Sequence, residues 1–363
     1  MKKKIKILHL EASKGWGGQE IRILKESQGM QKRGYEIFFA ISKGGLLIEK
    51  LKKEGFKKIY EVDFRKRKWV YSFFVLSNII KENDIDIINT HSSQDAWLGG
   101  MVGKLLKKPI IRTRHLSTRV KGGLNSYFLY NFLVNYVITT CEETKVKIIK
   151  QSKKNKKYFS SIPTGVDPNN MFIEDIHFRK KIEISEKDFL VGTCCFLRCW
   201  KGIEDFLEAA NILRNNTNIK WLIIGEGETD KYEKIAKRKN LKNVIFTGYL
   251  ENPFSAMNSL DIFLLLSTAH EGVSQAMLQA AYLEKPLIGT NIGGIFEVCI
   301  DKKTGFLVPP FNPEKIVKAI LEMKNNDKMR REMSINAKRL VLDKFSFEKM
   351  LDDTENIYFN ILK

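Results

Sequence analysis

The sequence lacks the marks of several protein classes. None of its apolar runs approaches the roughly 20 residues that a membrane-spanning helix needs. Its five cysteines form no CxxC pair, so buried thiols in a reducing compartment are favoured over a zinc site at Cys194, Cys195 and Cys199. The amino terminus has only a short apolar stretch before Glu11, which predicts a first β-strand and not a signal peptide. These absences indicate a compact cytoplasmic protein.

Two phosphate-binding fingerprints are also absent near the amino terminus. The segment EASKGWGG at residues 11–18 contains neither GxGxxG nor GxxxxGK[ST], which excludes a dinucleotide fingerprint and a Walker A loop there. It does contain Gly17 and Gly18 before an expected helix, where a ligand could approach the backbone closely. A structural turn accounts for these two glycines equally well. Asp84 and Asp86 lie at the start of a strand, which is the wrong end for a site, so we assign them no metal role.

Strand-like and helix-like segments alternate along the chain, which is typical of parallel sheets in doubly wound domains. The chain of 363 residues suits two domains, and Pro163, Gly165 and Pro168 mark the joint between them. We therefore predict an α/β fold with two Rossmann-like domains facing a central cleft, at residues 1–164 and 165–345. The expected strands are residues 4–10, 35–41, 58–62, 86–91, 108–115 and 136–140 in the first half, and 189–195, 220–225, 244–248 and 261–267 in the second.

Positive charge is concentrated in the first half of the chain. The formal net charge is +20, and residues 1–170 hold 34 Lys and Arg against 15 Asp and Glu, so nearly all of the excess lies there. This asymmetry predicts a polyanionic partner for the first domain, such as a membrane surface, an anionic glycolipid or a nucleic acid.

A basic and aromatic segment, FRKRKWVYSFF, occupies residues 64–74. Cations next to aromatic side chains are typical of an anionic membrane interface. The segment fits equally well a solvated loop leading into a core-packing helix, since helical apolar spacing continues through residue 80. The residues predicted here to contact an acceptor or a membrane are Arg65, Lys66, Arg67, Lys68 and Trp69.

A second basic cluster ends the strand KPIIRTRH at residues 108–115. Arg112, Arg114 and His115 are expected near the carboxyl edge of the first sheet, and Arg119 lies in the cationic loop that follows. We expect the three arginines to contact an anionic acceptor.

The most informative stretch of the second half is HEGVSQAMLQAAYLEKP at residues 270–286, which follows the apolar run DIFLLLS. Glu271 falls in a tight turn, and a helix is expected from Ser274. Free backbone N–H groups and the positive end of the helix dipole would then lie at the carboxyl edge of a sheet, where α/β proteins bind phosphates. Gln279 lies eight positions after Glu271, two helical turns on.

Two cations and a glycine turn accompany this stretch. Arg198 and Lys201 follow the strand at residues 189–195, where fixed positive charge could stabilise a departing diphosphate. Gly225 and Gly227 form a turn after the strand at residues 220–225, and Leu250 follows the next strand, where it could flank a base.

These motifs resemble those of retaining glycosyltransferases of family four, which have the GT-B fold. The pair Glu271 and Gln279 resembles the family's E-x7-E element with Gln in the second place, and PTGVD at residues 163–167 resembles its PNGVD segment. The strings NIGGIFE at residues 291–297 and TGFLVPP at residues 304–310 are specific in combination. The resemblance implies that a C-terminal helix at residues 346–363 crosses back to the first domain.

The resemblance also implies a role for each site residue. Glu271 would orient the donor sugar, Lys201 and Arg198 would stabilise the departing charge, and His115 would contact the donor sugar. Gln279 would bind the ribose hydroxyls less strongly than a carboxylate does. The expected donor-binding residues are Gly17, Gly18, Gly225, Gly227, Leu250, Val273, Ser274, Gln275, Ala276 and Gln279.

The resulting prediction is a retaining hexosyltransferase that needs no metal and no cofactor. It would transfer a sugar from a nucleotide-sugar, by expectation a UDP-sugar, to an anionic glycan or glycolipid of the cell envelope, such as lipopolysaccharide, at the inner face of the plasma membrane. A nucleotide-sugar epimerase of the same fold stays open as an alternative. A basic nucleic-acid binder is the other alternative, although the sequence shows no nucleic-acid-binding motif. A phosphorylase would need a pyridoxal lysine, which nothing in the sequence marks.

Overall fold

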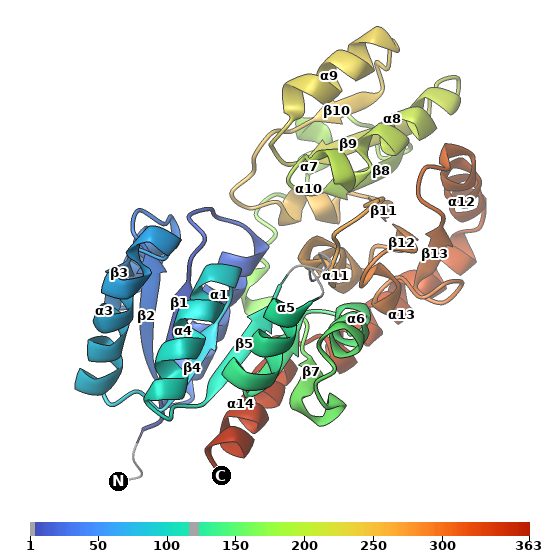
Figure 1. The fold of residues 1–363 in the computed structure, drawn as a ribbon. Helices are drawn as coiled ribbons and strands as arrows, with labels where there is room; N and C mark the ends of the chain where they lie inside the picture. The colour runs from blue at the N-terminus through green and yellow to red at the C-terminus, as the bar shows by residue number, and fades with distance from the viewer. Residues whose placement is uncertain (1–3, 116–122) are drawn as a thin grey trace. The chain divides into compact units, whose positions relative to one another are not determined.

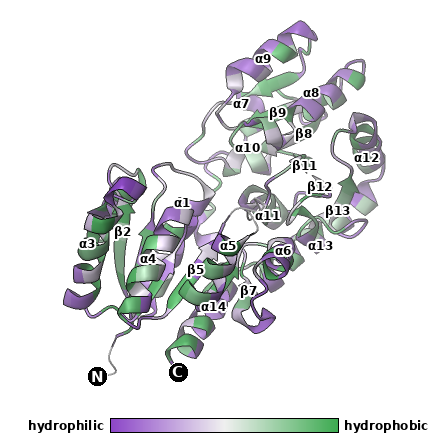
Figure 2. Cartoon of the chain, in the orientation of Figure 1, coloured by the Kyte–Doolittle hydropathy of each residue, from purple (hydrophilic) through white to green (hydrophobic). Residues whose placement is uncertain are grey.

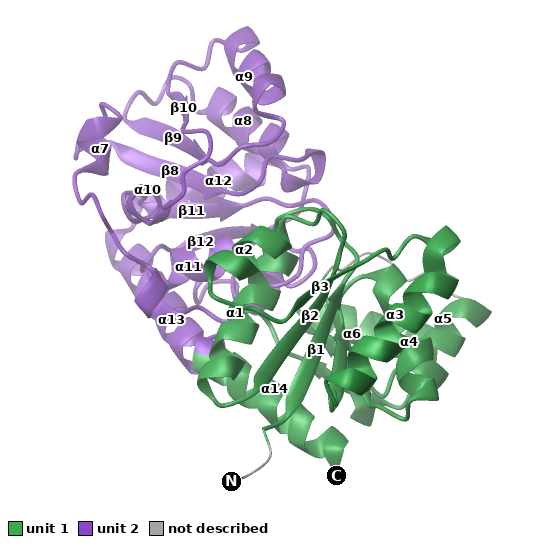
Figure 3. Ribbon diagram, turned by 90° about the vertical axis from the view of Figure 1, so that its left-hand side faces the viewer, with its two compact units in different colours: residues 1–164, 348–363 green, residues 165–347 purple. Residues whose placement is uncertain are grey.

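The computed structural model describes residues 4–115 and 123–363, and Figure 1 shows the order of its elements. The chain forms two compact units: residues 1–164 with 348–363 make unit 1, and residues 165–347 make unit 2 (Figure 3). Each unit is built on its own parallel sheet. Among the described residues, we find no helix with both the length and the apolar character needed to cross a bilayer.

Unit 1 contains a sheet of seven described strands in the order β3-β2-β1-β4-β5-β6-β7. The strand order reverses between β1 and β4, and such a switch point is where open α/β sheets bind ligands at their carboxyl ends. The strands are β1 (Lys6–Glu11), β2 (Glu36–Ser42), β3 (Ile59–Val62), β4 (Ile87–Thr90), β5 (Ile110–Arg114), β6 (Tyr136–Thr139) and β7 (Phe159–Ser161). The helices are α1 (Gly18–Lys32), α2 (Leu47–Lys53), α3 (Trp69–Glu82), α4 (Ser93–Leu105), α5 (Leu124–Phe128), α6 (Glu142–Ser152) and α14 (Phe347–Leu362), with the short turns η1 (Lys66–Lys68), η2 (Leu129–Leu133) and η3 (Lys156–Tyr158).

Unit 2 repeats this arrangement with six described strands in the order β10-β9-β8-β11-β12-β13, so its switch point lies between β8 and β11. The strands are β8 (Phe189–Cys194), β9 (Ile219–Ile224), β10 (Val244–Phe246), β11 (Ile262–Leu265), β12 (Leu287–Thr290) and β13 (Gly305–Val308). The helices are α7 (Phe178–Lys181), α8 (Ile203–Ile212), α9 (Thr229–Arg238), α10 (Phe254–Asn258), α11 (Gln275–Tyr282), α12 (Pro313–Asn325) and α13 (Asp327–Lys344), with the short turns η4 (Pro168–Asn170), η5 (Cys199–Lys201) and η6 (Ile295–Glu297).

The sequence explains why these segments become strands and helices. β11 is the continuous apolar run IFLL, and all four of its residues are buried, as expected of a central parallel strand covered on both faces. α12 begins with Pro313 in its first turn, and the side chain of Asn312 accepts a hydrogen bond from the Lys315 N–H. The predicted fold class of two doubly wound, Rossmann-like α/β sheets is confirmed. β7 was not predicted, because its last two residues, Ser160 and Ser161, fall in the segment that the sequence marks as a joint.

The C-terminal helix α14 packs within unit 1 through polar as well as apolar contacts. The hydroxyl of Tyr358 donates to the Glu26 carboxylate at 3.1 Å, and Arg22 Nε donates to the same carboxylate at 3.3 Å. All three side chains are buried. Burial, followed by the negative charge of Glu26, raises the pKa of Tyr358 well above its usual value, so its hydroxyl remains a donor.

The Tyr358–Glu26 contact generates a stability prediction. Tyr358→Phe removes one donor from a buried carboxylate, which should lower the free energy of unfolding by about 1–3 kcal/mol. Urea denaturation followed by circular dichroism measures this change. Tyr249→Phe is the control, because the Tyr249 side chain is exposed, and its effect should be close to zero. Equal stability of the two variants would show that the buried hydroxyl contributes nothing.

Candidate functional site

The switch point of unit 2 brings a lysine and a glutamate together. Lys201 follows β8 and Glu271 follows β11, and these two strands are neighbours in the sheet. Lys201 Nζ lies 2.6 Å from Glu271 Oε2, and the hydroxyl of Ser267 donates to the same oxygen, also at 2.6 Å. Glu271 is only 7% exposed. The structure therefore joins two of the predicted site residues in a shielded ion pair.

The electrostatics of the pair keep the lysine charged. Burial is the largest single influence and lowers the pKa of Lys201, but the charge of Glu271, the hydrogen bond to Glu271 and the neighbouring Cys195 together outweigh it, and the net shift is upward. Because the pKa in the folded protein lies above that of the unfolded chain, the pair stabilises the fold at neutral pH, and this contribution is lost only when alkaline pH deprotonates the lysine. The site thus presents a permanent ammonium group beside a carboxylate.

Two glycines hold the backbone on either side of this pair. Gly202 has a left-handed φ of 68°, and a Cβ at this position would lie 2.0 Å from the carbonyl oxygen of Leu266 at the end of β11. Gly293 also has positive φ, and a Cβ there would lie 1.8 Å from the carbonyl oxygen of Glu271. The Gly294 N–H donates to that same oxygen at 3.2 Å. The NIGGIFE segment therefore supports the turn that carries Glu271.

The turn with Gly225 and Gly227 supports the loop that carries the cations. Cβ atoms at these two glycines would lie 2.0 and 2.4 Å from the carbonyl oxygens of Cys195 and Leu197, respectively. Leu197 also donates its N–H to the Glu226 carbonyl at 2.7 Å. Close packing within unit 2 is thus sufficient to require glycine at both positions, and their contact with a donor stays a prediction.

Arg198 lies between two aromatic rings. Its guanidinium carbon is 4.9 Å from the ring centre of Phe196 and 5.2 Å from that of Trp200, which is cation–π geometry. The Trp200 ring in turn meets His270 edge-on, with ring centres 5.8 Å apart. The side chain of Arg198 is exposed, so it is oriented by its neighbours and still open to a ligand.

The predicted phosphate-binding turn begins α11. The structure starts this helix at Gln275, with Ser274 as the cap: its hydroxyl accepts a hydrogen bond from the Met277 N–H at 3.4 Å. Val273 and Ser274 are buried, whereas Gln275, Ala276 and Gln279 are half-buried. Leu250, beyond β10, is half-buried as well. Gln275 Oε1 is buried and has no hydrogen-bond partner among the described residues.

The corresponding edge of unit 1 carries the first glycine loop. α1 begins at Gly18, with Gly17 in an extended conformation before it. A Cβ at Gly18 would meet no described atom within 4 Å, and one at Gly17 would make an ordinary contact with the Glu20 side chain at 3.7 Å. Packing within unit 1 therefore does not explain why both are glycines.

His115 is the outer member of a row of three histidines at this edge, of which His9 and His91 are buried. His9 Nδ1 lies 2.9 Å from His91 Nε2, and His91 Nδ1 lies 3.0 Å from His115 Nε2. Sequence reasoning singled out His115 and missed the other two. The available signal was that all three occur at or just after the ends of predicted strands.

Arg112 has partners within unit 1, and its contact with an acceptor stays a prediction. Arg112 is 4% exposed, lies 3.6 Å from the buried Asp95 carboxylate and donates to the Ser92 carbonyl. Its position on β5 places its side chain beside Ser92 and Asp95, the two residues that cap the start of α4. Arg114 is half-buried, and it donates to the Tyr130 hydroxyl at 3.5 Å. Arg119 lies outside the described residues.

The basic and aromatic segment is an exposed turn followed by a helix that packs on the core. Lys66, Arg67 and Lys68 form the exposed turn η1, and Arg65 pairs with Asp63. Trp69 does not project freely as an anchor, because its indole N–H donates to the Phe64 carbonyl at 2.8 Å and its ring packs on the core. The exposed apolar side chains are instead Val70, Tyr71 and Phe74, on the outer face of α3. Figure 2 shows how apolar this helix is along its length.

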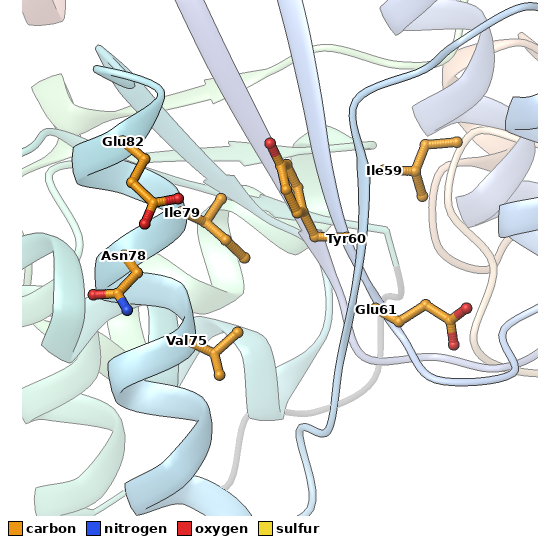
Figure 4. A pocket seen from close by; sticks show the side chains of 7 residues that line it. All are labelled: Ile59, Tyr60, Glu61, Val75, Asn78, Ile79 and Glu82. Carbon is orange, nitrogen blue, oxygen red and sulfur yellow. The ribbon is translucent and has the colours of Figure 1, made fainter.

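Neither the pocket on unit 1 nor the cysteines add to the candidate site. A shallow pocket between β3 and α3 contains none of the predicted residues; it is lined by Ile59, Tyr60, Glu61, Val75, Asn78, Ile79 and Glu82 (Figure 4). Within the described part of the chain, no group of three or more His, Cys, Asp or Glu side chains is arranged to hold a metal ion. Burial raises the pKa of Cys194 to about 12 and that of Cys195 to about 11, so both are neutral thiols.

Known proteins share both halves of this arrangement. The family described as Glycosyltransferase Family 4 matches residues 16–170, and the family described as Glycosyl transferases group 1 matches residues 174–340. The chain is 24% identical over 296 residues to the capsular polysaccharide biosynthesis glycosyltransferase CapM of Staphylococcus aureus, a match that covers 76% of this chain and 77% of CapM.

Solved structures show the same fold. A glycosyltransferase from Rickettsia africae superposes with a TM-score of 0.87 at 22% identity, over 99% of each chain. HepE of Anabaena, solved in complex with UDP, superposes with a TM-score of 0.86 at 18% identity, over 98% of this chain and 100% of HepE.

The close approach at Gly202 generates a second prediction. Gly202→Ala should lower the free energy of unfolding by about 1–3 kcal/mol more than Gly248→Ala does, because only the first substitution forces a Cβ against a backbone oxygen. Gly248 is a matched control: its φ is 67°, and no described atom lies within 4 Å of the added carbon. Urea denaturation of the two variants measures the difference. Equal destabilisation would mean that backbone strain alone, and not the contact with Leu266, requires the glycine.

Proposed function

The chain belongs to glycosyltransferase family 4, and from this membership we propose that it is a retaining, metal-independent hexosyltransferase. It transfers a sugar from a nucleotide-sugar to an anionic glycan or glycolipid of the cell envelope. The observation that carries the proposal is the ion pair of Lys201 and Glu271 at the switch point of unit 2, beside the first turn of α11.

Unit 2 supplies what the departure of a nucleoside diphosphate requires. Negative charge grows on the leaving phosphate as the glycosidic bond breaks, and preorganised donors in a shielded site stabilise it most effectively. An ammonium group has three N–H donors, and Glu271 accepts one of those of Lys201, which leaves donors for phosphate oxygens. Arg198, held between its two rings, adds a second fixed charge. In this proposal the two cations do the work that a metal ion does elsewhere.

Glu271 has a different task. Its second carboxylate oxygen is available to accept hydrogen bonds from sugar hydroxyls, while Ser267 and Lys201 fix the orientation of the first. The N–H groups that begin α11 bind the phosphates. Gln279, about one turn further along that helix, hydrogen-bonds the ribose. A UDP-sugar is the proposed donor, and the complex of HepE with UDP supports this choice.

The anionic character of the acceptor is inferred from charge. The first 170 residues hold almost all of the net positive charge, and the capsular polysaccharide role in the name of CapM supports an acceptor of the cell envelope. Positive potential over a surface speeds the encounter with a polyanion.

We further propose that unit 1 binds the inner face of the plasma membrane peripherally. Val70, Tyr71 and Phe74 of α3 are 77%, 68% and 64% exposed, directly after the cations of η1. α4 packs against both α3 and η2, and its Trp97 stacks on Phe128, which is 46% exposed. Exposed rings next to lysines and arginines suit the headgroup region of an anionic bilayer.

The catalytic proposal predicts the behaviour of Glu271→Ala. Its sugar transfer from radiolabelled UDP-sugars should fall about 100- to 1,000-fold, as expected when one preorganised group is removed from a reacting centre. Glu332→Ala, on the exposed face of α13, is the control and should keep full turnover. A folded Glu271→Ala that still transfers at the wild-type rate would exclude this site.

The same assay tests the reaction type. NMR of the product should show the anomeric configuration of the donor sugar, and inversion would contradict the retaining mechanism. Isomerisation of the UDP-sugar in the absence of any acceptor would instead indicate an epimerase.

The membrane proposal predicts a loss of vesicle binding. The double variant Tyr71→Ser with Phe74→Ser should bind phosphatidylglycerol vesicles at least about tenfold more weakly in sedimentation assays, because each buried ring contributes roughly 1.5–3 kcal/mol. Ile335→Ser, an exposed apolar residue of α13, is the control and should bind as wild type does. Unchanged binding of the double variant would place the membrane contact elsewhere.

A further inference from the structure

The three histidines at the carboxyl edge of unit 1 form one continuous hydrogen-bonded row. The ring centres are 5.2 Å apart at each step, and the rings are inclined by 14° between His9 and His91 and by 34° between His91 and His115. His9 and His91 are buried, at 0% and 2% exposure, whereas His115 is half-buried. The row therefore runs from the interior to the functional edge.

The sheet register produces this row. His9 of β1 lies opposite Asn89 of β4, and His91 is two residues beyond Asn89. Asn89 lies opposite Ile111 of β5, so His115 is likewise two residues beyond the position opposite His91. Side chains two residues apart project from the same face of a sheet, so the histidines step outward along one diagonal.

All three rings are neutral at physiological pH. Burial lowers the pKa of His9 to about 4, although Glu26 acts in the opposite direction. Burial also lowers the pKa of His91 and of His115 well below the usual value, and the cations Arg112 and Arg22 lower both further. A neutral imidazole has one N–H, so each ring both donates once and accepts once at most.

Two arrangements of the protons satisfy both hydrogen bonds. In the outward order, His9 Nδ1–H donates to His91 Nε2 and His91 Nδ1–H donates to His115 Nε2, which places the His115 proton on Nδ1. In the inward order, His115 Nε2–H donates to His91 and His91 Nε2–H donates to His9, which places the His9 proton on Nε2. His91 has a single N–H, so it must donate in one of the two hydrogen bonds and accept in the other. Any other arrangement of the protons loses one of the bonds.

The inner end of the row distinguishes the two orders. His9 Nε2 is buried and has no hydrogen-bond partner among the described residues. The inward order would bury an N–H donor there without an acceptor, a situation that folded proteins rarely tolerate. The outward order leaves only a lone pair at that atom.

We propose that His9 and His91 are positioning residues that fix His115 as a neutral imidazole with its proton on Nδ1, presented to an oxygen acceptor of the bound sugar. His115 is then a hydrogen-bond donor that orients the substrate, and not a general base. The identity of the ligand rests on the proposed glycosyltransferase function, whereas the position of the proton does not.

Nitrogen NMR of the protein labelled with 15N-histidine tests the proton positions directly. The chain has five histidines, and the remaining two, His177 and His270, are exposed and serve as internal references. Long-range 1H–15N spectra distinguish a protonated from an unprotonated ring nitrogen. The expected result is His115 protonated at Nδ1 and unprotonated at Nε2 from pH 6 to 8. A His115 proton on Nε2, or a His115 ring that titrates in this range, would overturn the proposal.

A pair of variants separates the hydrogen-bonded row from simple packing. His91→Phe keeps a ring of similar size and removes both hydrogen bonds, so the His115 nitrogen shifts should move to the average of two tautomers. The KM for the UDP-sugar should rise about tenfold with kcat nearly unchanged, because the lost contact acts equally on bound substrate and transition state. Phe39→Leu is the matched control, since Phe39 stacks on His9 without any ring nitrogen, and it should change neither quantity.

The outcomes separate this proposal from the function on which its ligand rests. Equal changes in both variants would assign the effect to packing and reject the row as the cause. If His91→Phe fails to fold, the wild-type spectra alone still decide the tautomer. If the wild-type protein transfers no sugar, the proposed function fails while the proton assignment is still tested.

Discussion

The ion pair of Lys201 and Glu271 is the interaction on which the rest of unit 2 depends. Removing two charges from water is costly, and a buried pair repays that cost only when its geometry is fixed and its other atoms are satisfied. Here the geometry comes from backbone contacts that only glycine permits, at Gly202 against Leu266 and at Gly293 against Glu271 itself. The strands that carry the two loops are neighbours, so the sheet order sets their distance.

The two units share one sheet topology but carry different kinds of side chain at their switch points. Both sheets reverse their strand order after the first strand, and both place polar side chains at the carboxyl ends on either side of that reversal. Unit 2 holds a charged pair there, which suits a phosphate leaving group whose charge changes during reaction. Unit 1 holds a row of neutral imidazoles, which suits recognition of uncharged hydroxyls. The carboxyl edge of the unit 2 sheet thus provides charge, and the carboxyl edge of the unit 1 sheet provides hydrogen bonds from neutral side chains.

Most of the fold and part of the candidate site could be predicted from the sequence, and the contacts that were not predicted have a common cause. The alternation of apolar runs and helices predicts two doubly wound sheets, and the spacing from Glu271 to Gln279 identifies the central turn. The contact between Lys201 and Glu271 spans 70 residues and exists only because β8 and β11 are adjacent, which local patterns do not specify. The ion pair of Arg112 with Asp95 was not predicted for the same reason, because Asp95 lies on another element. The histidine row was missed because its diagonal depends on the register of three strands.

The large positive charge of the first half has little part in the chemistry of either edge. Two buried arginines of unit 1 are balanced by nearby carboxylates, Arg22 by Glu26 and Arg112 by Asp95. The excess must then lie mainly on exposed side chains such as Lys66, where water and salt screen each charge beyond about 8–10 Å. Charges screened in this way attract a polyanionic surface over a distance but stabilise a reacting group poorly. In the proposed function, encounter with the partner and stabilisation of the leaving group are therefore separate tasks, the first assigned to exposed lysines and the second to Lys201 and Arg198.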